Sequence, residues 1–490
     1  MNSTSAAAGS PNATENLKRL PILIALVIGA FFSILNETLL NVAYVRLMED
    51  FQVAYTTVQW LSTSYMLVVG ILVPVSALLI GWLTTRQMFI GALSLFTLGT
   101  LVCALSPDFS ILLGGRVIQA LGTGLMLPVM MNTILVLYPP ENRGAAMGSI
   151  GLVIMFAPAI GPTLSGLILE SLDWRWLFWL VLPFAALSIL IAWIYMRNVT
   201  DVTKPRIDVL SILLSTVAFG GIVYGFSTLG KPDKGWESPE VYLTVISGIV
   251  CLLLFVLVQL RSKEPMLDFR VFRTPMFSLA TILIIIVMMS LFSTLLLLPI
   301  LMQQGMLMTA FAAGLVLLPG GILNGFLSPV TGKLFDKFGP RALVIPGAAL
   351  LVLVMWLFTR IDLETSKSMI ILLHCLMSIS LSMIIMPAQT NGLNGLSRSH
   401  YPHGTAINNT LQQVSGALGI AIFFGIMTSG QNRFLEEAGH SAGTPLDVTN
   451  PLFAPSLSAG VSESFKFGLI FAVIALVVAL FIRKSEVPKS

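Results

Sequence analysis

Residues 277–302 read FSLATILIIIVMMSLFSTLLLLPILM, a run without a single charged side chain. A helix needs about 20 apolar residues to cross the hydrocarbon core of a bilayer, and this run is longer than that. A strand of a membrane barrel needs only about 10 residues and alternates in polarity, whereas this run is continuously apolar. Because backbone amides in lipid must bond within their own segment, the run predicts a membrane-spanning helix.

Composition extends this prediction to most of the chain. Of its 490 residues, 56% are hydrophobic and 10% are charged, whereas a soluble globular protein carries about 25% charged residues. So little charge cannot cover a water-exposed surface, and long apolar blocks such as residues 21–45 recur along the chain. We therefore expect an all-α protein that crosses the inner, or cytoplasmic, membrane many times.

The apolar blocks predict fourteen transmembrane helices. An even number of spans places both termini on the same side of the membrane. The predicted spans lie at residues 21–45, 58–80, 88–106, 110–137, 146–169, 176–196, 208–228, 241–260, 277–302, 310–331, 342–359, 368–388, 404–427 and 464–482.

The basic residues predict the orientation of these spans. With both termini inside, 18 of the 27 Lys and Arg residues fall on inner loops and 8 on outer loops. Loops on the cytoplasmic side carry the excess of Lys and Arg, so both termini are predicted to be cytoplasmic. The net charge of +4 is spread over these loops, which argues against a nucleic-acid partner.

Two charged residues, Glu37 and Arg116, fall within predicted spans. A charge at the bilayer centre costs at least about 2.5–3.5 kcal/mol, so such residues usually mark a substrate or proton pathway. Counted along their helices, Glu37 lies about 24 Å and Arg116 about 21 Å from the inner edge of the hydrocarbon. Both charges thus share a depth, and a direct or water-bridged pair is expected.

An internal repeat divides the chain. Residues 74–86, PVSALLIGWLTTR, align with residues 329–341, PVTGKLFDKFGPR, at an offset of 255 residues. Six spans with loops need fewer residues than this offset, so the pair of spans at 208–260 is an insertion between two related halves. The predicted organisation is a tail at 1–20, a six-helix bundle at 21–197, linking helices at 198–275, a second bundle at 276–483 and a tail at 484–490.

Four motifs add a family resemblance. They are LNETLLNVA at 35–43, RVIQALG at 116–122, APAIGPTLSG at 157–166 and GKLFDKFGPR at 332–341. These segments are similar to the LDxTIVNVA, RxxQGxG, GPxxGG and GxLxDxxGxR motifs of the major facilitator superfamily. Together they resemble its fourteen-span drug:proton antiporter family, in the multidrug and lincomycin-type efflux branch.

The resemblance implies a 6+2+6 arrangement of helices and export of small lipophilic or cationic molecules by alternating access. The energy source would be the proton gradient, with no cofactor and no enzymatic activity, and the protein is expected to be a monomer in the bilayer. Asn36 replaces the usual Asp of the first motif, and Glu37 supplies a carboxylate one residue later. We therefore assign proton coupling to Glu37 with Arg116.

The resemblance also suggests roles for other residues. An antiporter motif that acts as a hinge or seal between the halves is expected at Gly151, Pro158, Gly161, Pro162 and Gly166. A cytoplasmic gate is expected at Gly332, Asp336, Lys337, Gly339 and Arg341, together with Arg86 from the eroded first copy of the loop motif. Polar and aromatic residues predicted to line the substrate cavity are Asn41, Trp60, Tyr65, Gln119, Asn132, Asn408, Gln412 and Gln413.

Other functions were weighed against efflux. The chain lacks a phosphate-binding loop of the kind an ATP-driven pump needs, and its four His residues form no catalytic or metal-binding pattern in the sequence. A lipid or glycolipid flippase, or an exporter of one metabolite, stays open as an alternative on the same fold. A symporter that imports a nutrient with protons is disfavoured by the antiporter-like fifth span.

Overall fold

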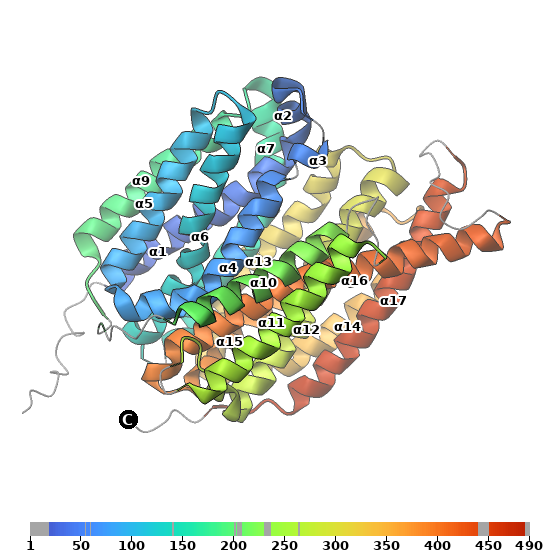
Figure 1. The fold of residues 1–490 in the computed structure, drawn as a ribbon. Helices are drawn as coiled ribbons and strands as arrows, with labels where there is room; N and C mark the ends of the chain where they lie inside the picture. The colour runs from blue at the N-terminus through green and yellow to red at the C-terminus, as the bar shows by residue number, and fades with distance from the viewer. Residues whose placement is uncertain are drawn as a thin grey trace, which may run out of the picture.

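The computed structural model describes residues 19–53, 55–58, 60–139, 142–199, 202, 208–229, 237–262, 265–439 and 450–485. Within these ranges the chain is helical and contains no strand. Figure 1 shows long helices that run roughly parallel in two groups, as expected for segments that must satisfy their backbone bonds internally.

The described part of the N-terminal half contains nine helices, six of which are long. The short ones are α2 (Tyr44–Phe51), α3 (Tyr55–Val58) and α8 (Trp176–Trp179). The long ones are α1 (Arg19–Val42), α4 (Trp60–Trp82), α5 (Thr85–Ala104), α6 (Phe109–Leu137), α7 (Arg143–Ser171) and α9 (Val181–Tyr195).

Two linking helices and six further long helices complete the described chain. The linking helices are α10 (Val209–Leu229) and α11 (Pro239–Arg261), and the short segments after them are η3 (Phe269–Arg273), η4 (Leu301–Gly305) and η5 (Arg398–His400). The C-terminal half consists of α12 (Pro275–Ile300), α13 (Ala310–Phe338), α14 (Arg341–Phe358), α15 (Lys367–Asn394), α16 (Tyr401–Glu437) and α17 (Phe453–Leu480).

Each predicted span overlaps a helix of the structure, but several helices run past the predicted limits. The helix predicted at 310–331 continues to Phe338, and the one predicted at 404–427 extends from Tyr401 to Glu437. Within the described ranges, ten helices are long and apolar enough to cross a membrane, or eleven if the two parts of the bent α7 count as one span.

The two halves meet along two seams. Helix α7 packs against α13 along one seam, and α4 and α6 pack against α16 along the other. The linking helices α10 and α11 pair with each other, and α10 contacts both α4 and α16. In Figure 1 this green pair lies beside both bundles, so the inserted helices cover the α4–α16 seam.

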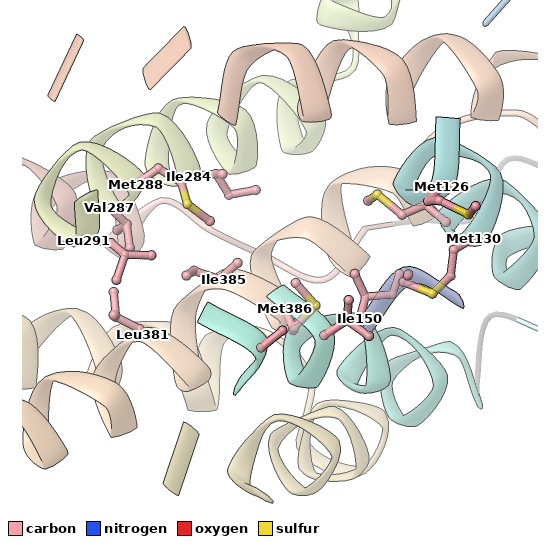
Figure 2. Packing of buried hydrophobic residues seen from close by; sticks show 14 of the residues in the cluster. Met126, Met130, Ile150, Ile284, Val287, Met288, Leu291, Leu381, Ile385 and Met386 are labelled. Carbon is pink, nitrogen blue, oxygen red and sulfur yellow. The ribbon is translucent and has the colours of Figure 1, made fainter. Parts of the chain in front are cut away.

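An apolar layer fills the space between the halves. Figure 2 shows Met126, Met130 and Ile150 of the N-terminal half on one side of this layer, with Ile385 and Met386 of α15 opposite. All of these side chains are buried. The outer surface is also apolar, because α11 exposes a row of large side chains, Leu243, Ile246, Ile249, Val250, Leu253, Leu254, Leu257 and Leu260.

Helix α1 begins and α17 ends on the same face of the molecule. The Arg19 guanidinium lies 5.9 Å from the ring centre of Tyr138, at the end of α6. The backbone carbonyl of Arg483 accepts a hydrogen bond from the Asn391 side chain near the end of α15. We call this face the inner face, following the predicted orientation, and the opposite one the outer face.

Candidate functional site

A buried polar network surrounds Arg116 in the N-terminal half. Arg116 Nη1 donates to Asn36 Oδ1 at 3.0 Å and to Gln119 Oε1 at 2.9 Å. Gln119 Nε2 in turn donates to Asn36 Oδ1 at 3.0 Å and to Thr100 Oγ1 at 2.8 Å. Helices α1, α5 and α6 are thereby joined around one guanidinium that is fully buried.

Tyr65 of α4 closes this network on another side. The Arg116 guanidinium lies 4.1 Å from the centre of the Tyr65 ring, a distance typical of a cation–π contact. The Tyr65 hydroxyl donates to Thr123 Oγ1 at 2.7 Å. Arg116 Nε and Nη2 have no hydrogen-bond partner among the described residues, so the cation keeps bonding capacity that this conformation does not use.

Glu37 stands beside the network without joining it. The structure places no ion pair between Glu37 and Arg116 within the described chain, so the predicted direct pair is not formed in this conformation. Successive helix residues point about 100° apart, and this turn directs Asn36, not Glu37, at the guanidinium. Glu37 is half-buried, and Arg116 is the charged group that acts on it electrostatically.

Helix α7 carries the predicted hinge and bends at that point. Its parts Arg143–Pro158 and Thr163–Ser171 are inclined to each other by 42°. Proline removes a backbone donor from the helix interior and favours a kink, and Pro158 ends the first of these two parts. The side chain of Pro162 lies outside the described part of the structure. The predicted hinge residues Pro158, Gly161 and Pro162 therefore lie at or within this bend, and their role as a hinge stays a prediction.

Gly161 and Gly166 do not seal the two halves as predicted. A Cβ at Gly161 would overlap Oγ1 of Thr38 on α1. This glycine therefore allows α7 to pack closely against α1 within the N-terminal half, at the residue that follows Glu37. At Gly166 the nearest atom to such a Cβ, Phe311 Cδ2 of α13, is 3.6 Å away. The outer ends of α7 and α13 thus meet in ordinary van der Waals contact.

Replacing Gly161 by Ala is expected to destabilise the N-terminal half by about 1–3 kcal/mol, because the added methyl group forces α1 away from α7. Thermal unfolding of the purified protein in detergent would measure this effect. Gly114→Ala is the matched control, since a Cβ at that helical glycine meets nothing within 4 Å. Equal melting temperatures for the two variants would contradict the assignment.

The inner ends of α7 and α13 are packed much more closely. A Cβ at Gly148 would overlap the Ser328 carbonyl oxygen, and one at Gly332 would overlap the Gly144 carbonyl oxygen. Small residues allow membrane helices to approach until their backbones touch. A Cβ at Gly151 would lie 2.7 Å from Ser328 Oγ, so Gly151 belongs to this close contact as well.

Asp336 links the halves at the same inner end. Its two carboxylate oxygens accept hydrogen bonds from the backbone amides of Gly144, at 2.9 Å, and Ala145, at 3.1 Å. These amides lie in the first turn of α7, where a negative charge is favoured. Gly339 ends α13 with a φ of 77°, a left-handed conformation that suits glycine. The predicted gate role of Asp336 therefore has a defined partner.

Arg143 is a second inner contact, which sequence analysis missed. Its Nη1 donates to Asn394 Oδ1 at 2.8 Å and to the Tyr401 hydroxyl at 2.9 Å, and its Nη2 donates to the Leu135 carbonyl at 2.6 Å. Arg143 lies in a predicted loop, yet it is 3% exposed. Asn394 and Tyr401 belong to the other half, so no local pattern could reveal their contact. We call the Asp336 and Arg143 contacts together the inner gate.

Three other predicted gate residues do not join the inner gate. Lys337 is exposed and lies over the ring of Phe338, 5.1 Å from its centre. Arg341 is exposed, and no ion pair of the described chain includes it. Arg86 donates to the Trp193 carbonyl at 2.7 Å and so ties α5 to α9 inside the N-terminal half.

Asp336→Ala is expected to weaken the inner gate by about 0.5–2 kcal/mol, the usual value of a helix cap. Spin labels at Asn198 and Arg398, two exposed residues of opposite halves, would report a larger population with separated inner ends. Asp362→Ala, an exposed acid on the other face, is the control. A distance distribution identical to that of the unsubstituted protein would show that the cap does not hold the gate.

The predicted cavity residues lie in different places. Tyr65 and Gln119 belong to the Arg116 network, whereas Asn132 lines a void of about 10 Å³ between α4, α5 and α6. Trp60 is 38% exposed and lies 6.0 Å from the Tyr224 ring of linking helix α10. The side chain of Asn41 is outside the described part of the structure. The described members of the predicted set therefore do not share one wall in this conformation, and their role in a substrate cavity stays a prediction.

The remaining cavity candidates lie on α16. Asn408 is buried and accepts a hydrogen bond from Thr281 of α12 at 3.0 Å. Gln412 is buried as well, and its Nε2 has no partner among the described residues. Gln413 is exposed. Of these three residues, Gln412 alone offers an unused donor in the protein interior.

A larger cavity, of about 310 Å³, opens on the outer face of the N-terminal half. It lies between α2 and the end of α7, and its lining includes Glu49, Asp50, Glu170 and Asp173. Asp50 accepts a hydrogen bond from Trp174 at 2.8 Å. No residue of the other half lines this cavity, so it is separate from the seam between the halves.

The protein consists of two apolar helical bundles that meet along a hydrogen-bonded seam, and the N-terminal bundle buries the guanidinium of Arg116. These features define a polytopic membrane transporter. The family model of the Major Facilitator Superfamily matches residues 26–420. The chain belongs to this superfamily and is a multi-pass protein of the cell membrane.

Comparison with known proteins gives closely similar relatives. The lincomycin resistance protein LmrB of Bacillus subtilis (strain 168) is 52% identical, over 97% of this chain and 98% of that protein. The protein of the same name from Listeria monocytogenes is 50% identical, over 96% of this chain and 98% of that protein. The crystal structure of the human organic anion transporter MFSD10 shares the fold, with a TM-score of 0.65 at 14% identity, covering 94% and 99% of the two chains.

Proposed function

We propose that the chain exports lincomycin and other small lipophilic or cationic drugs across the cytoplasmic membrane. Two relatives at 50% identity or more are lincomycin resistance proteins, and a more distant one, 26% identical, is the multidrug export protein EmrB of Haemophilus influenzae. The near-complete coverage of both LmrB chains supports the transfer of this function to the present protein.

One observation carries the proposed mechanism. At its inner end, the seam between α7 and α13 is hydrogen-bonded and the two backbones touch, whereas the described outer contacts, Gly166 with Phe311 and Thr163 with Gly314, are at ordinary van der Waals distance. Such an asymmetry is expected of one end state of alternating access, in which rigid halves rock about a central site. The structure then corresponds to a state closed toward the cytoplasm.

Proton exchange would supply the energy. Glu37 is a half-buried carboxylate beside a buried guanidinium that retains unused donors. Loss of a proton from Glu37 would strengthen its attraction to Arg116 or to a cationic substrate, and uptake of a proton would weaken it. This arrangement supports the exchange of protons for drug molecules at a site in the N-terminal half.

The proposal includes the membrane topology. Fourteen crossings with cytoplasmic termini agree with the distribution of Lys and Arg and with the return of α17 to the face on which α1 begins. Helices α4, α10 and α16 would then be the remaining three crossings, and α4 and α10 are continuously apolar like the other spans. The functional unit would be a monomer with one pathway between its halves.

Proteoliposomes test the proposal. An imposed pH gradient should drive accumulation of lincomycin and of a lipophilic cation, and a protonophore should abolish it. Labelled phospholipid and glycolipid in the same liposomes test the flippase alternative. Gradient-driven movement of lipid without any accumulation of drug would refute the drug-export proposal.

A further inference from the structure

Four uncharged polar side chains lie on α15 and α16, the helices that end and begin at the inner-gate residues Asn394 and Tyr401. They are Gln389 and Thr390 of α15 with Asn409 and Gln412 of α16, and all four are buried. We call them the amide cluster. Only Gln412 of these four is among the predicted cavity residues. In sequence, polar residues near the end of a helix resemble residues that merely face the membrane–water interface.

Two side chains of the amide cluster reach the same sulfur atom of the N-terminal half. Gln389 Nε2 lies 3.8 Å and Asn409 Nδ2 lies 3.2 Å from Sδ of Met131 on α6. A thioether is a weak hydrogen-bond acceptor. Two amides of one half are therefore directed at the other half without a strong acceptor to receive them.

Other atoms of the amide cluster have no partner at all. Gln389 Oε1, Thr390 Oγ1 and Gln412 Nε2 are buried and unpaired among the described residues. A buried amide or hydroxyl that lacks a partner costs free energy, whereas an apolar side chain of similar shape would not. These polar groups do not stabilise the closed conformation. Their presence therefore indicates that they bind a partner in another conformation.

Opening of the inner gate would expose the amide cluster. Asn394, which binds Arg143 in the gate, lies five residues after Gln389 on α15, a distance of about 8 Å along the helix. Met126, Met130 and Met386 lie in the apolar layer of Figure 2, and Met386 is three residues before Gln389 on α15. Methionine side chains are flexible and fit apolar groups of varied shape.

We propose that the amide cluster is a loading site for amphipathic molecules that carry hydroxyl or amide groups. The inference rests on the proposed export function and adds a substrate class to it. The amides offer both donors and acceptors to hydroxyl and amide groups, and the methionines receive the apolar part. A lipophilic cation without such groups gains nothing from the cluster and depends on the carboxylate of Glu37 instead.

Transport kinetics in inside-out membrane vesicles test this assignment. Lincomycin, which carries hydroxyl groups and an amide, is compared with tetraphenylphosphonium, which carries neither. Gln389→Leu and Asn409→Leu should each raise the KM for lincomycin about tenfold, the effect of one or two lost hydrogen bonds. The KM for tetraphenylphosphonium should change less than about twofold, because this ion makes no hydrogen bond. Gln304→Leu, at an exposed glutamine, is the matched control.

Two outcomes of the kinetics would overturn the inference. An unchanged KM for lincomycin would show that the cluster does not bind it. An equal rise for both ligands would show a general effect on the fold. If the unsubstituted protein accumulates neither ligand, the proposed function fails, and binding must then be measured without transport.

Cysteine labelling provides that independent measurement. The variant Asn409→Cys is made in a chain whose native Cys103, Cys251 and Cys375 are replaced by Ala. A membrane-impermeant maleimide should label it from the inner side, and lincomycin should slow this labelling about tenfold at a concentration of about ten times its Kd. Labelling that lincomycin does not slow would overturn the loading site even if export itself is confirmed.

Discussion

Replacement of Glu37 by Gln is expected to abolish drug accumulation driven by a pH gradient. The amide keeps the size and hydrogen-bonding capacity of the side chain but cannot release a proton. Glu37 is the carboxylate on which the buried Arg116 acts, and because a charge within the membrane is costly, it usually marks a transport pathway. Accumulation by the variant in proteoliposomes should equal that of liposomes without protein.

Exchange of labelled for unlabelled drug separates a loss of coupling from a loss of folding. Because exchange needs no net proton movement, Glu37→Gln should retain it. Glu170→Gln, at an exposed carboxylate near the outer end of α7, should accumulate drug normally. Full gradient-driven accumulation by Glu37→Gln would require a different carboxylate to carry the proton.

Gly148→Leu should hold the inner ends of the halves apart and stop transport. The carbonyl oxygen of Ser328 occupies the position that even a Cβ at Gly148 would need. Overpacking of this kind costs about 1–3 kcal/mol or more, which shifts a two-state equilibrium by roughly 5–150-fold. The closed state would be depopulated, while the opened state, in which α7 leaves α13, would be unaffected.

Distances between spin labels at Asn198 and Arg398 would show this shift directly. The distribution should move to longer distances in Gly148→Leu and stay unchanged in Gly91→Leu, where a Cβ meets nothing within 4 Å. A Gly148→Leu protein that closes and transports normally would disprove the close contact of α7 with α13.

Sequence analysis located the helices well because lipid imposes a simple rule on them. An uninterrupted apolar run such as residues 277–302 has one stable conformation in a bilayer. The predicted end of helix α13 was too early, because Lys333, Asp336 and Lys337 are charged like loop residues. These residues nevertheless continue the helix beyond the apolar block. Hydropathy marks the membrane boundary and not the end of the helix.

The polar contacts were harder to predict. The depth calculation correctly placed Arg116 near the first span, but rotation about the helix axis decided that Asn36 and not Glu37 would contact it. A shift of one residue changes this rotation by about 100°, which a depth argument cannot detect. Arg143 depends on residues some 250 positions away, and a single sequence contains no signal for such a pair.

The α10–α11 hairpin has a consequence for molecules dissolved in the bilayer. Its residues Ile222 and Val245 pack with Val414 and Leu418 of α16, and a Cβ at Gly220 would touch Ile71 of α4 at 3.4 Å. Acyl chains therefore meet the hairpin, and not the seam, on this side. Once the inner ends of α7 and α13 separate, a lipophilic drug in the inner leaflet would reach the seam from their side and not from the side of the hairpin, so lateral access to the transporter is one-sided.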